Sequence, residues 1–456
     1  MLTTRQLLRG FGMDRAVFYA MGARIWQIPS GIVTATLIAL CLDERQQGIY
    51  LLLWWLVGFQ ALVDAGLLNT LLHAASHEAA KSRFDSRGFI RVSRRSRGRL
   101  AGLTRFAIAW FGIAAFLLAV VGGIVGVVLL NRTGVAFHDM GPLFAAMMMA
   151  GLALSVSPLI AILEGCNQVQ VVNRYRFGQA VMGSLVVWAC LMSGAGMWAV
   201  AAGITVQLVW ELALVASRYR RFFFQLVRTA TRDFSWREEV WPLQWRIGVQ
   251  SIARYVAFLP IYPVLFDTHG PELAGLYGLT WQVMSNMMMV AYAYVRTRSP
   301  EFGQLIAEDR RTESNQLFRR ATVGSTLLLS AMSLTFCVVL GLLPQLNWEY
   351  TTKFASAFLD PIICVWFAVA LIPIHLTQCF AMHIRSQKFD PIWRVNLPAC
   401  LTLTVLAYFA AKSGEVVWIA VAMIVTFTAS AVALALMWRW YHRYFERIEG
   451  DARLDE

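Results

Sequence analysis

Two arginines stand inside strongly apolar stretches of this sequence, and both have the same local pattern. In the stretch GARIWQIPSG an Ala-Arg pair supplies Arg24, and Pro29 follows five residues later. In the stretch SIARYVAFLPIYP a second Ala-Arg pair supplies Arg254, and Pro260 follows six residues later. A charged side chain at membrane depth costs on the order of 3 kcal/mol or more, so it normally faces a water-filled cavity or a partner. The repeated arginine is therefore the first candidate for a functional group.

Guanidinium groups are well suited to binding phosphate. Their planar donors match two phosphate oxygens at once, and they stay charged at every physiological pH. If Arg24 and Arg254 line one central cleft from two sides, they can clamp a pyrophosphate group near its cytoplasmic opening. Two carboxylates, Asp64 and Glu211, lie at similar depth in other apolar stretches and offer the alternative of structural ion pairs with these arginines. The same carboxylates can also be interpreted as proton or sodium sites coupled to transport.

Uncharged polar residues within the apolar stretches form a second set of candidates. They could bind sugar hydroxyls, and hydrogen bonds between helices explain each of them equally well. No phosphate-binding glycine loop, zinc-ligand spacing or Ser-His-Asp set occurs at usable positions, and none of the seven cysteines forms a CxxC pair. We therefore predict no catalytic residue, no metal site and no cofactor, and the protein is not expected to be an enzyme. The uncharged candidates are Gln27, Gln60, Gln207, Gln282 and Asn286.

The composition is typical of a membrane protein. Of the 456 residues, 58% are hydrophobic and only 15% are charged, whereas soluble domains carry about a quarter charged residues. Apolar stretches of about 20 residues, the length that spans a bilayer as a helix, recur along the whole chain. We predict an all-α fold with twelve transmembrane helices, at residues 17–41, 49–73, 106–130, 143–163, 177–195, 197–218, 247–267, 273–296, 321–344, 358–384, 395–412 and 416–440.

The basic residues decide how these helices are oriented. If the N-terminus is cytoplasmic, only four of the 40 Lys and Arg residues fall in or beside the predicted periplasmic loops. Positive charge concentrates on the cytoplasmic side of membrane proteins, so both termini are predicted to be cytoplasmic. The densest basic run, KSRFDSRGFIRVSRRSRGR, is interpreted as a topology signal that contacts anionic lipid headgroups, not nucleic acid. The four periplasmic residues are Arg45, Arg132, Lys353 and Lys412.

The chain shows signs of an internal repeat. The second helix of each predicted half begins alike, with GIYLLLW at 48–54 and GLYGLTW at 275–281. Between the halves, the segment 217–234 mixes arginines with aromatic residues and is predicted to be an interfacial amphipathic helix. Because six helices separate the two arginines, the halves would be related by a pseudo-two-fold axis along the membrane normal. We expect an N-lobe at 1–216, a cytoplasmic amphipathic linker at 217–246, a C-lobe at 247–440 and a cytoplasmic tail at 441–456.

These features together resemble a known family. The two six-helix halves, the G-x-Y motif of each second helix, the stretch VDAGLLNTLL (63–72) and the stretch RSPEFGQLIA (298–307) resemble the polysaccharide-export branch of the multidrug/oligosaccharidyl-lipid/polysaccharide flippase superfamily. That branch contains the flippases of O-antigen and exopolysaccharide repeat units. The resemblance implies that basic residues in the lumen bind the substrate, which here would be Arg24 and Arg254.

The resemblance implies a flippase in the bacterial inner membrane, serving surface polysaccharide biosynthesis. It would move a polyprenyl-pyrophosphate-linked oligosaccharide by alternating access. Membrane lipids are expected partners, while a coupling proton or sodium ion and the polysaccharide polymerase machinery stay open. The alternative is a cation-coupled multidrug exporter on the same scaffold. An exporter of organic cations needs carboxylates in its cleft, whereas the repeated feature here is an arginine, so the flippase is favoured. A glycan polymerase or ligase is disfavoured because every predicted periplasmic loop is short.

Overall fold

A computed structural model of the chain shows an all-helical fold with one short hairpin. Contacts divide the chain into two compact units, Met1–Ile252 (unit 1) and Ala253–Glu456 (unit 2). The prediction of an all-α fold is confirmed for the described residues, while the number of membrane crossings and the two-lobe symmetry stay predictions. The structure describes residues 15–64, 66–79, 83–84, 90–91, 93–229, 235–236, 241–298, 301–302, 305–306, 308, 310–386 and 391–454.

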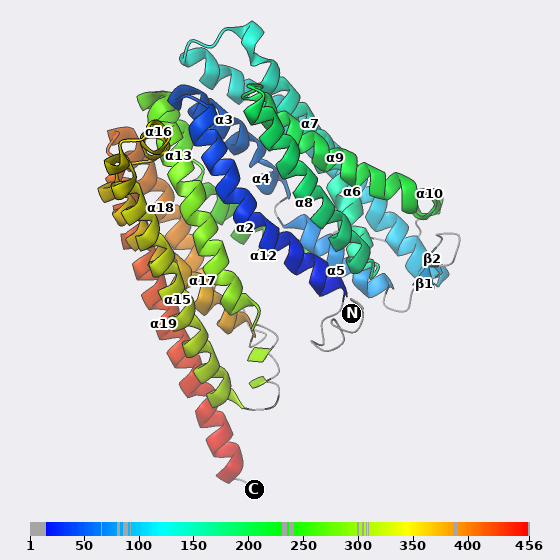
Figure 1. The fold of residues 1–456 in the computed structure, drawn as a ribbon. Coiled ribbons are helices and arrows are strands. Elements are labelled where there is room, and N and C mark those ends of the chain that lie inside the picture. The colour runs from blue at the N-terminus through cyan, green and yellow to red at the C-terminus, as the bar shows by residue number, and fades with distance from the viewer. Residues whose placement is uncertain are drawn as a thin grey trace, which may run out of the picture. The chain divides into compact units, whose positions relative to one another are not determined.

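Unit 1 is a helical bundle with α7 at its centre (Figure 1). α7 packs against α5, α6 and α9, while α8 packs against α2 and α9. The helices of unit 1 are α2 (Arg15–Cys41), α3 (Glu44–Val57), α4 (Gln60–Asp64), α5 (Leu67–Ala79), α6 (Arg94–Arg132), the 3-10 helix η1 (Phe137–Met140), α7 (Gly141–Gly165), α8 (Val169–Met192), α9 (Trp198–Arg218) and α10 (Arg220–Arg228).

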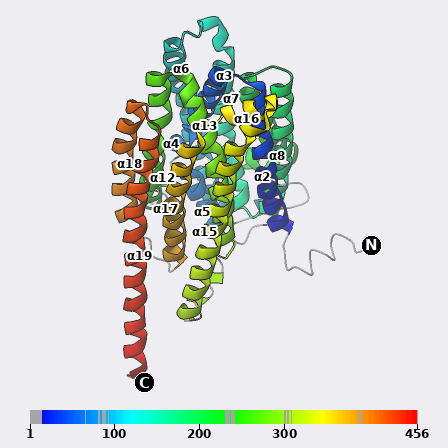
Figure 2. The same cartoon turned by 60° about the vertical axis from the view of Figure 1, so that its left-hand side comes forward.

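Unit 2 is built around α17. This helix packs against α13, α15 and α19, and α18 packs against α13 and α19. Figure 2 shows α15, α17 and α19 running side by side, with α19 continuing past the end of α17. Helix α12 crosses the boundary between the units. The elements are α12 (Trp241–Phe258), α13 (Ile261–Arg296), α15 (Arg311–Leu342), the 3-10 helix η2 (Leu343–Leu346), α16 (Glu349–Ser356), α17 (Pro361–Ser386), α18 (Trp393–Ser413) and α19 (Val417–Leu454).

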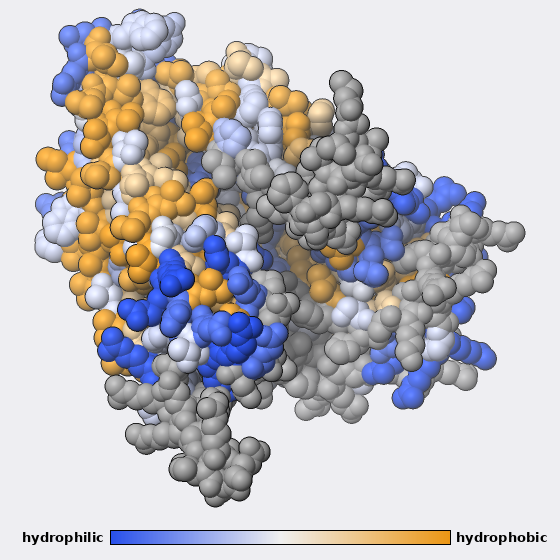
Figure 3. Space-filling model, turned by 60° about the horizontal axis from the view of Figure 1, so that its bottom comes forward, coloured by the Kyte–Doolittle hydropathy of each residue, from blue (hydrophilic) through white to orange (hydrophobic). Residues whose placement is uncertain are grey.

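Long apolar helices account for most of both units. Within the described ranges, eight helices are long and apolar enough to cross a membrane. Their outer faces carry large apolar side chains, such as Leu327 and Leu334 of α15, which are 65% and 63% exposed. Figure 3 shows hydrophobic residues covering the flank of unit 2, on the left, and hydrophilic residues gathered at the end that faces the viewer. Because water disfavours such apolar surface, a lipid environment explains it. The protein is therefore a multi-pass membrane protein.

Glycines allow the helices of unit 1 to pack closely. A Cβ on Gly165 of α7 would lie 2.5 Å from the carbonyl oxygen of Leu72 in α5. A Cβ on Gly151 of the same helix would lie 2.8 Å from the carbonyl oxygen of Ala115 in α6. Small residues that let two backbones approach are a common basis of helix association in membranes.

The second helix of unit 1 differs from its prediction. The range 49–73 was expected to form one helix, but the structure has α3, α4 and α5 there, with breaks after Val57 and after Asp64. Gly66, at the second break, has a φ of +74°, a left-handed conformation that glycine adopts without strain. The helix predicted at 247–267 is also interrupted, because α12 ends at Phe258 and α13 begins at Ile261.

The amphipathic segment predicted at 217–234 contains α10. Its buried face consists of Phe222, Phe223 and Leu226, which fits the expected pattern, and the helix packs on α6. Arg105 of α6 donates to the carbonyl oxygen of Thr229 over 2.8 Å and so fixes the end of α10. Residues 230–234 lie outside the described part of the chain. Nearby, the two-residue strands β1 (Arg83–Phe84) and β2 (Ile90–Arg91) pair antiparallel, and the backbone N–H of Ile90 donates to Gln225 of α10.

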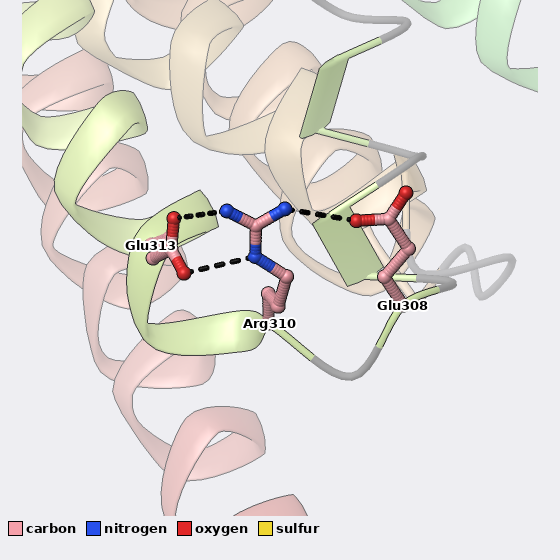
Figure 4. A network of polar contacts seen from close by, with 3 residues as sticks. All are labelled: Glu308, Arg310 and Glu313. Atoms are coloured by element: carbon pink, nitrogen blue, oxygen red, sulfur yellow. Dashed lines mark hydrogen bonds and ion pairs between the residues drawn. The ribbon is translucent and has the colours of Figure 1, made fainter.

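An ion-pair network marks the start of α15 (Figure 4). Arg310 donates to both carboxylate oxygens of Glu313, over 2.9 and 2.7 Å, and to Glu308 over 3.0 Å. These hydrogen bonds to Glu313 and Glu308 raise the pKa of Arg310 above its usual value. All three side chains are more than half exposed, so water and salt screen the network and it adds little to stability.

Candidate functional site

Arg254 lies four residues before the end of α12 and has an exposed side chain. Its positive charge acts on Tyr292 of α13 and on Cys400 of α18, so the guanidinium lies beside these two helices. The hydroxyl of Thr404 in α18 donates to the carbonyl oxygen of Val256 over 3.3 Å and ties α12 to the same place. Within the described part of the chain, no carboxylate forms an ion pair with Arg254. The guanidinium is therefore open to an anionic ligand.

Arg24 lies in α2, and its side chain is outside the described part of the structure. The residue three positions on, Gln27, is exposed. Residues three apart in a helix are neighbours on its surface, so both belong to one face of α2. A different face of α2 packs on α8, where Trp26 donates to Ser184 over 3.3 Å. Binding of a ligand by Arg24 and Gln27 stays a prediction.

Asp64 stands at the break before α5. Its Oδ1 accepts a hydrogen bond of 2.9 Å from the backbone N–H of Leu68, in the first turn of α5. A carboxylate at this place satisfies a free backbone donor and interacts favourably with the positive end of the helix dipole. The side chain thus has a structural task in the fold. Neither its predicted ion pair with Arg24 nor its predicted role as a coupling site is tested by this contact.

Glu211 belongs to a charged cluster between α7, α8 and α9 that we call the unit 1 charge cluster: Glu164, Arg176, Gln207 and Glu211. Arg176 of α8 forms an ion pair with Glu164 of α7 through both guanidinium ends. The same positive charge acts on Glu211 of α9. Gln207 donates to Glu211 Oε1 over 3.2 Å, while the buried Oε2 has no hydrogen-bond partner among the described residues.

The unit 1 charge cluster contains two carboxylates and one arginine. Glu164 is nearly enclosed, with 12% of its side chain exposed, whereas Arg176 is 49% exposed. A group with a net negative charge and an unpaired carboxylate oxygen can accept a proton or a small cation.

Just beyond α9, burial raises the pKa of the Tyr219 hydroxyl, which therefore stays protonated and donates to Gln168 over 2.7 Å.

Gln282 and Asn286 lie one helical turn apart on α13. Gln282 is half-buried, and its Oε1 has no hydrogen-bond partner among the described residues. Asn286 is exposed. Both amides are thus free to meet polar groups from outside the helix, and binding of sugar hydroxyls there stays a prediction.

Four ionisable residues with buried or paired side chains were not among the candidates predicted from the sequence. Glu164 was missed because it stands in the last turn of an apolar helix, where a charge normally reaches the interface. Its partner Arg176 follows across the short connection between α7 and α8, and opposite charges on two such neighbouring helices could have signalled the pair. The other two are His375 and His383 of α17, both fully buried. A histidine within an apolar transmembrane stretch is itself a signal of function.

Within the ranges that the structure describes, no three His, Cys, Asp or Glu side chains are grouped so that they could hold a metal ion. The described cysteines are all free thiols.

Comparisons with known proteins identify the fold. No family model matches the sequence, and no curated protein matches it either. Among solved structures, the chain is similar to a multidrug resistance MATE family transporter of the MOP superfamily in an inward-facing conformation, with a TM-score of 0.63 and 11% identity over 94% of this chain and 99% of that one. It is also similar to the MATE transporter VcmN of Vibrio cholerae, with a TM-score of 0.53 and 13% identity over 94% of this chain and 96% of that one.

The similarity extends over almost the whole of both chains, and the sequences have diverged far. At these identities the agreement concerns the course of the helices, not the residues that bind substrate. The chain has the fold of the MATE transporters of the MOP superfamily.

Proposed function

We propose that the protein is a flippase of the bacterial inner membrane. It moves a polyprenyl-pyrophosphate-linked oligosaccharide from the inner to the outer leaflet by alternating access between an N-lobe and a C-lobe. The fold supports a transporter, since the similar solved structures are transporters. The observation that favours this cargo is Arg254, an exposed guanidinium in an apolar region without a carboxylate partner among the described residues.

The charge of Arg254 explains why a phosphate cargo is preferred. Keeping an arginine at membrane depth costs on the order of 3 kcal/mol, and an ion pair would offset that cost within the protein. Without such a pair, the cost is offset when a diphosphate enters and accepts the bidentate hydrogen bonds of the guanidinium. Gln282 and Asn286 on α13 then offer amides to the hydroxyls of the sugar. Arg24 and Gln27 on α2 contribute the matching groups of the N-lobe.

The remaining partners follow from the same proposal. The polyprenyl chain stays in the bilayer while its headgroup crosses, so membrane lipids surround the cargo throughout. The exposed face of α10, with Arg220, Phe224 and Arg228, rests on the cytoplasmic leaflet. The translocated repeat unit is delivered to the polysaccharide polymerase machinery on the outer side. No chemical step on the cargo is part of this function.

Complementation of a deletion strain tests the proposal. Loss of the protein should cause undecaprenyl-linked oligosaccharide to accumulate in the inner leaflet, and the wild-type chain should restore glycan at the cell surface. Arg254→Ala, inserted at the wild-type level, should fail to restore it. Arg254→Lys should restore only part, because a lysine keeps the charge and loses the bidentate geometry. Arg310→Ala serves as the control that removes an exposed arginine. Full surface glycan with Arg254→Ala would refute the proposed clamp.

A second candidate function is export of cationic drugs coupled to a cation. It is favoured by the unit 1 charge cluster, in which Glu211 keeps a buried oxygen without a partner among the described residues. The similar structures of multidrug resistance transporters fit this candidate equally well. The two functions differ in the charge of the cargo. Glu211→Gln should abolish drug export and leave an anionic lipid cargo unaffected, whereas Arg254→Ala should do the reverse. Resistance to organic cations in cells that express Glu211→Gln or Arg254→Ala therefore separates the two functions.

A further inference from the structure

Unit 2 contains a seam of buried polar side chains between α15, α17 and α19. On α15 the hydroxyls of Ser314, Thr322, Ser325 and Ser333 are all less than 10% exposed. Their spacing puts them on one face of the helix, and 19 residues separate the first from the last. At 1.5 Å per residue this stripe covers about 28 Å, close to the thickness of the hydrocarbon core. Buried hydroxyls in a membrane helix need partners, and α17 supplies them for Ser314 and Ser325.

The partners on α17 are two histidines, His375 and His383. They lie eight residues apart, which is about 12 Å along the helix. Each is fully buried and meets a serine of α15 with its Nε2 atom: His375 meets Ser325 over 2.8 Å, and His383 meets Ser314 over 3.2 Å. Both pairs join a histidine Nε2 to a serine hydroxyl. They differ at Nδ1, which has a hydrogen-bond partner in His383 and none among the described residues in His375.

His383 has both ring nitrogens occupied. Its Nδ1 accepts a hydrogen bond of 3.0 Å from the indole N–H of Trp438 in α19. Its Nε2 therefore carries the proton of the neutral ring and donates to Ser314. The ring also stacks on Phe318, with 4.4 Å between the centroids. This histidine is fully satisfied as a neutral group.

His375 has one ring nitrogen unoccupied. The hydroxyl of Ser325 lies 3.0 Å from the carbonyl oxygen of Thr322 and 2.8 Å from His375 Nε2. When it donates to the Thr322 carbonyl, it accepts from His375. Nε2 consequently carries the proton, and Nδ1 is left with a lone pair. That Nδ1 atom is buried and has no hydrogen-bond partner among the described residues, and the same holds for the hydroxyl of Thr322. An unsatisfied buried polar atom is unfavourable, and binding of a ligand such as a proton at that atom relieves it.

Among the described residues, no carboxylate lies in contact with His375. On its own helix the nearest titratable group is Cys379, whose sulfur lies 3.5 Å from Nε2, followed by His383 and Arg385 toward the end. On α13 the titratable groups on the same side of the bundle are Tyr292 and Arg296. Helix α15 adds Cys337, and its charged residues Arg311, Glu313, Arg319 and Arg320 belong to its first three turns. Helix α19 contributes the neutral hydroxyls of Thr426 and Ser430, with Arg439 further along.

We propose that His375, with Ser325 and Thr322, is a proton-binding site inside unit 2, and that the proton is taken up at Nδ1. In the arrangement described here His375 and Ser325 are fully buried, which favours the neutral ring. Binding of a proton creates a cation with no carboxylate near it. The charged form therefore favours an arrangement in which water or an anionic group reaches the seam. Proton binding thus shifts unit 2 between two arrangements.

Coupling of this proton to transport rests on the proposed function. In a transporter, a site that is neutral in one arrangement and charged in another lets a proton gradient drive the cycle. One proton bound per cycle makes the driving concentration ratio change about tenfold per pH unit. His383 is the matched control, because it lies on the same helix, pairs with a serine in the same way and has no free nitrogen.

The first measurement detects proton binding without any cargo. Nitrogen NMR of the histidine-labelled, purified full chain is followed from neutral to acidic pH in wild type, His375→Gln and His383→Gln. The glutamine amide at 375 can still donate to Ser325, so the fold is expected to persist. One buried histidine signal should change protonation reversibly, be absent from His375→Gln and persist in His383→Gln. Thr322→Val, which removes a buried hydroxyl next to the Ser325–His375 pair, should shift the midpoint of that signal. Absence of a reversible change, or its loss only in His383→Gln, overturns the proposal.

The second measurement separates the proton site from the proposed cargo. Proteoliposomes containing wild type, His375→Gln or His383→Gln are given a pH gradient, and movement of a polyprenyl-pyrophosphate-linked oligosaccharide between leaflets is recorded. In wild type and in His383→Gln, the gradient should change the steady-state ratio of cargo between the two leaflets about tenfold per pH unit. His375→Gln should move cargo without responding to the gradient. Cargo movement that responds to the gradient in His375→Gln overturns the coupling and leaves the flippase intact. A titrating His375 in a protein that moves no such lipid supports the proton site and contradicts the proposed function.

Discussion

The first helices of the two units share a sequence pattern and differ in structure. In unit 1, α2 runs without interruption through Pro29. In unit 2, the helix that carries Arg254 ends at Phe258, and α13 begins just after Pro260. A second proline, Pro263, follows in the first turn of α13, where proline is well tolerated. Two prolines within four residues remove two backbone donors, so a break is more favourable there than a kink.

The second helices show the opposite difference. Unit 1 divides the corresponding segment into α3, α4 and α5, while unit 2 continues from Pro271 to Arg296 in one helix. Broken helices in transporters commonly lie where backbone groups or helix ends face a substrate or an ion. In unit 1 the breaks thus lie within the second predicted helix, after Val57 and Asp64, whereas in unit 2 they lie before it, at Pro260 and at Gly270. The two segments that begin with the G-x-Y motif therefore differ in whether their helix is continuous.

The interiors of the units differ as well. Eleven of the fifteen polar residues that are buried in the described part of the chain belong to unit 2, and both buried histidines are among them. Unit 1 instead holds the ion pair of Glu164 and Arg176 beside Glu211. Among the described residues, unit 1 thus contains a charged cluster between its helices, and unit 2 contains most of the buried polar groups.

The largest effect is expected from filling the close contact between α5 and α7. Gly165→Ala would force a Cβ against the carbonyl oxygen of Leu72, a backbone atom that cannot move aside alone. We expect a loss of about 3 kcal/mol, at the upper end of the cost of overpacking. Thermal unfolding in detergent measures it.

Two glycines provide matched controls for that substitution. Gly123→Ala in α6 of unit 1 meets no atom within 4 Å, and Gly324→Ala in α15 of unit 2 meets only Tyr294 at 3.7 Å. Both should leave the melting temperature unchanged or raise it slightly, because alanine favours helix. Equal melting temperatures for Gly165→Ala, Gly123→Ala and Gly324→Ala would show that the close contact at Gly165 does not matter for the stability of unit 1.

The second effect concerns the ion pair of unit 1. Arg176→Ala leaves the nearly enclosed Glu164 without a partner, and because the arginine is half-exposed we expect a loss of only about 1–2 kcal/mol. Adding Glu164→Gln removes the uncompensated charge and should recover most of that loss. A double-mutant cycle by thermal unfolding gives the coupling energy. Additive losses in the double variant would show that the two side chains act independently.

The smallest effect is expected at the surface network of unit 2. Arg310→Ala removes three hydrogen bonds to Glu308 and Glu313, and all of these side chains are exposed. Because water replaces the lost bonds, the melting temperature should not change measurably at physiological salt. A clear drop would mean that this network stabilises the start of α15 more than its exposure indicates.

Much of the helical framework could be predicted from the sequence. The ranges 143–163 and 395–412 correspond to α7 and α18 within two residues at each end, because apolar length and flanking polar residues define such helices. The breaks at Gly66 and Pro260 were missed, since a glycine or proline in an apolar stretch is compatible with a continuous helix, a kink or a break. The tertiary context decides among them.

The side-chain partners were predictable to a smaller extent. Periodicity tells which residues share a face of a helix, and not which neighbouring helix that face meets. The pairing of Glu164 with Arg176 and of His375 with Ser325 depends on the rotation and the neighbours of α7 and α17, which no local pattern contains. Asp64 was considered as an ion-pair partner, but its carboxylate caps a helix that the sequence analysis had not foreseen.

The most direct test of an anionic cargo is a transport measurement on the purified protein. Proteoliposomes with wild type, Arg254→Lys or Arg254→Ala are offered a polyprenyl-pyrophosphate-linked oligosaccharide in one experiment and an organic cation in another. We predict movement of the pyrophosphate lipid by wild type, partial movement by Arg254→Lys and none by Arg254→Ala, with no movement of the cation. Transport of the cation alone, or undiminished movement of the lipid by Arg254→Ala, would contradict the proposed flippase.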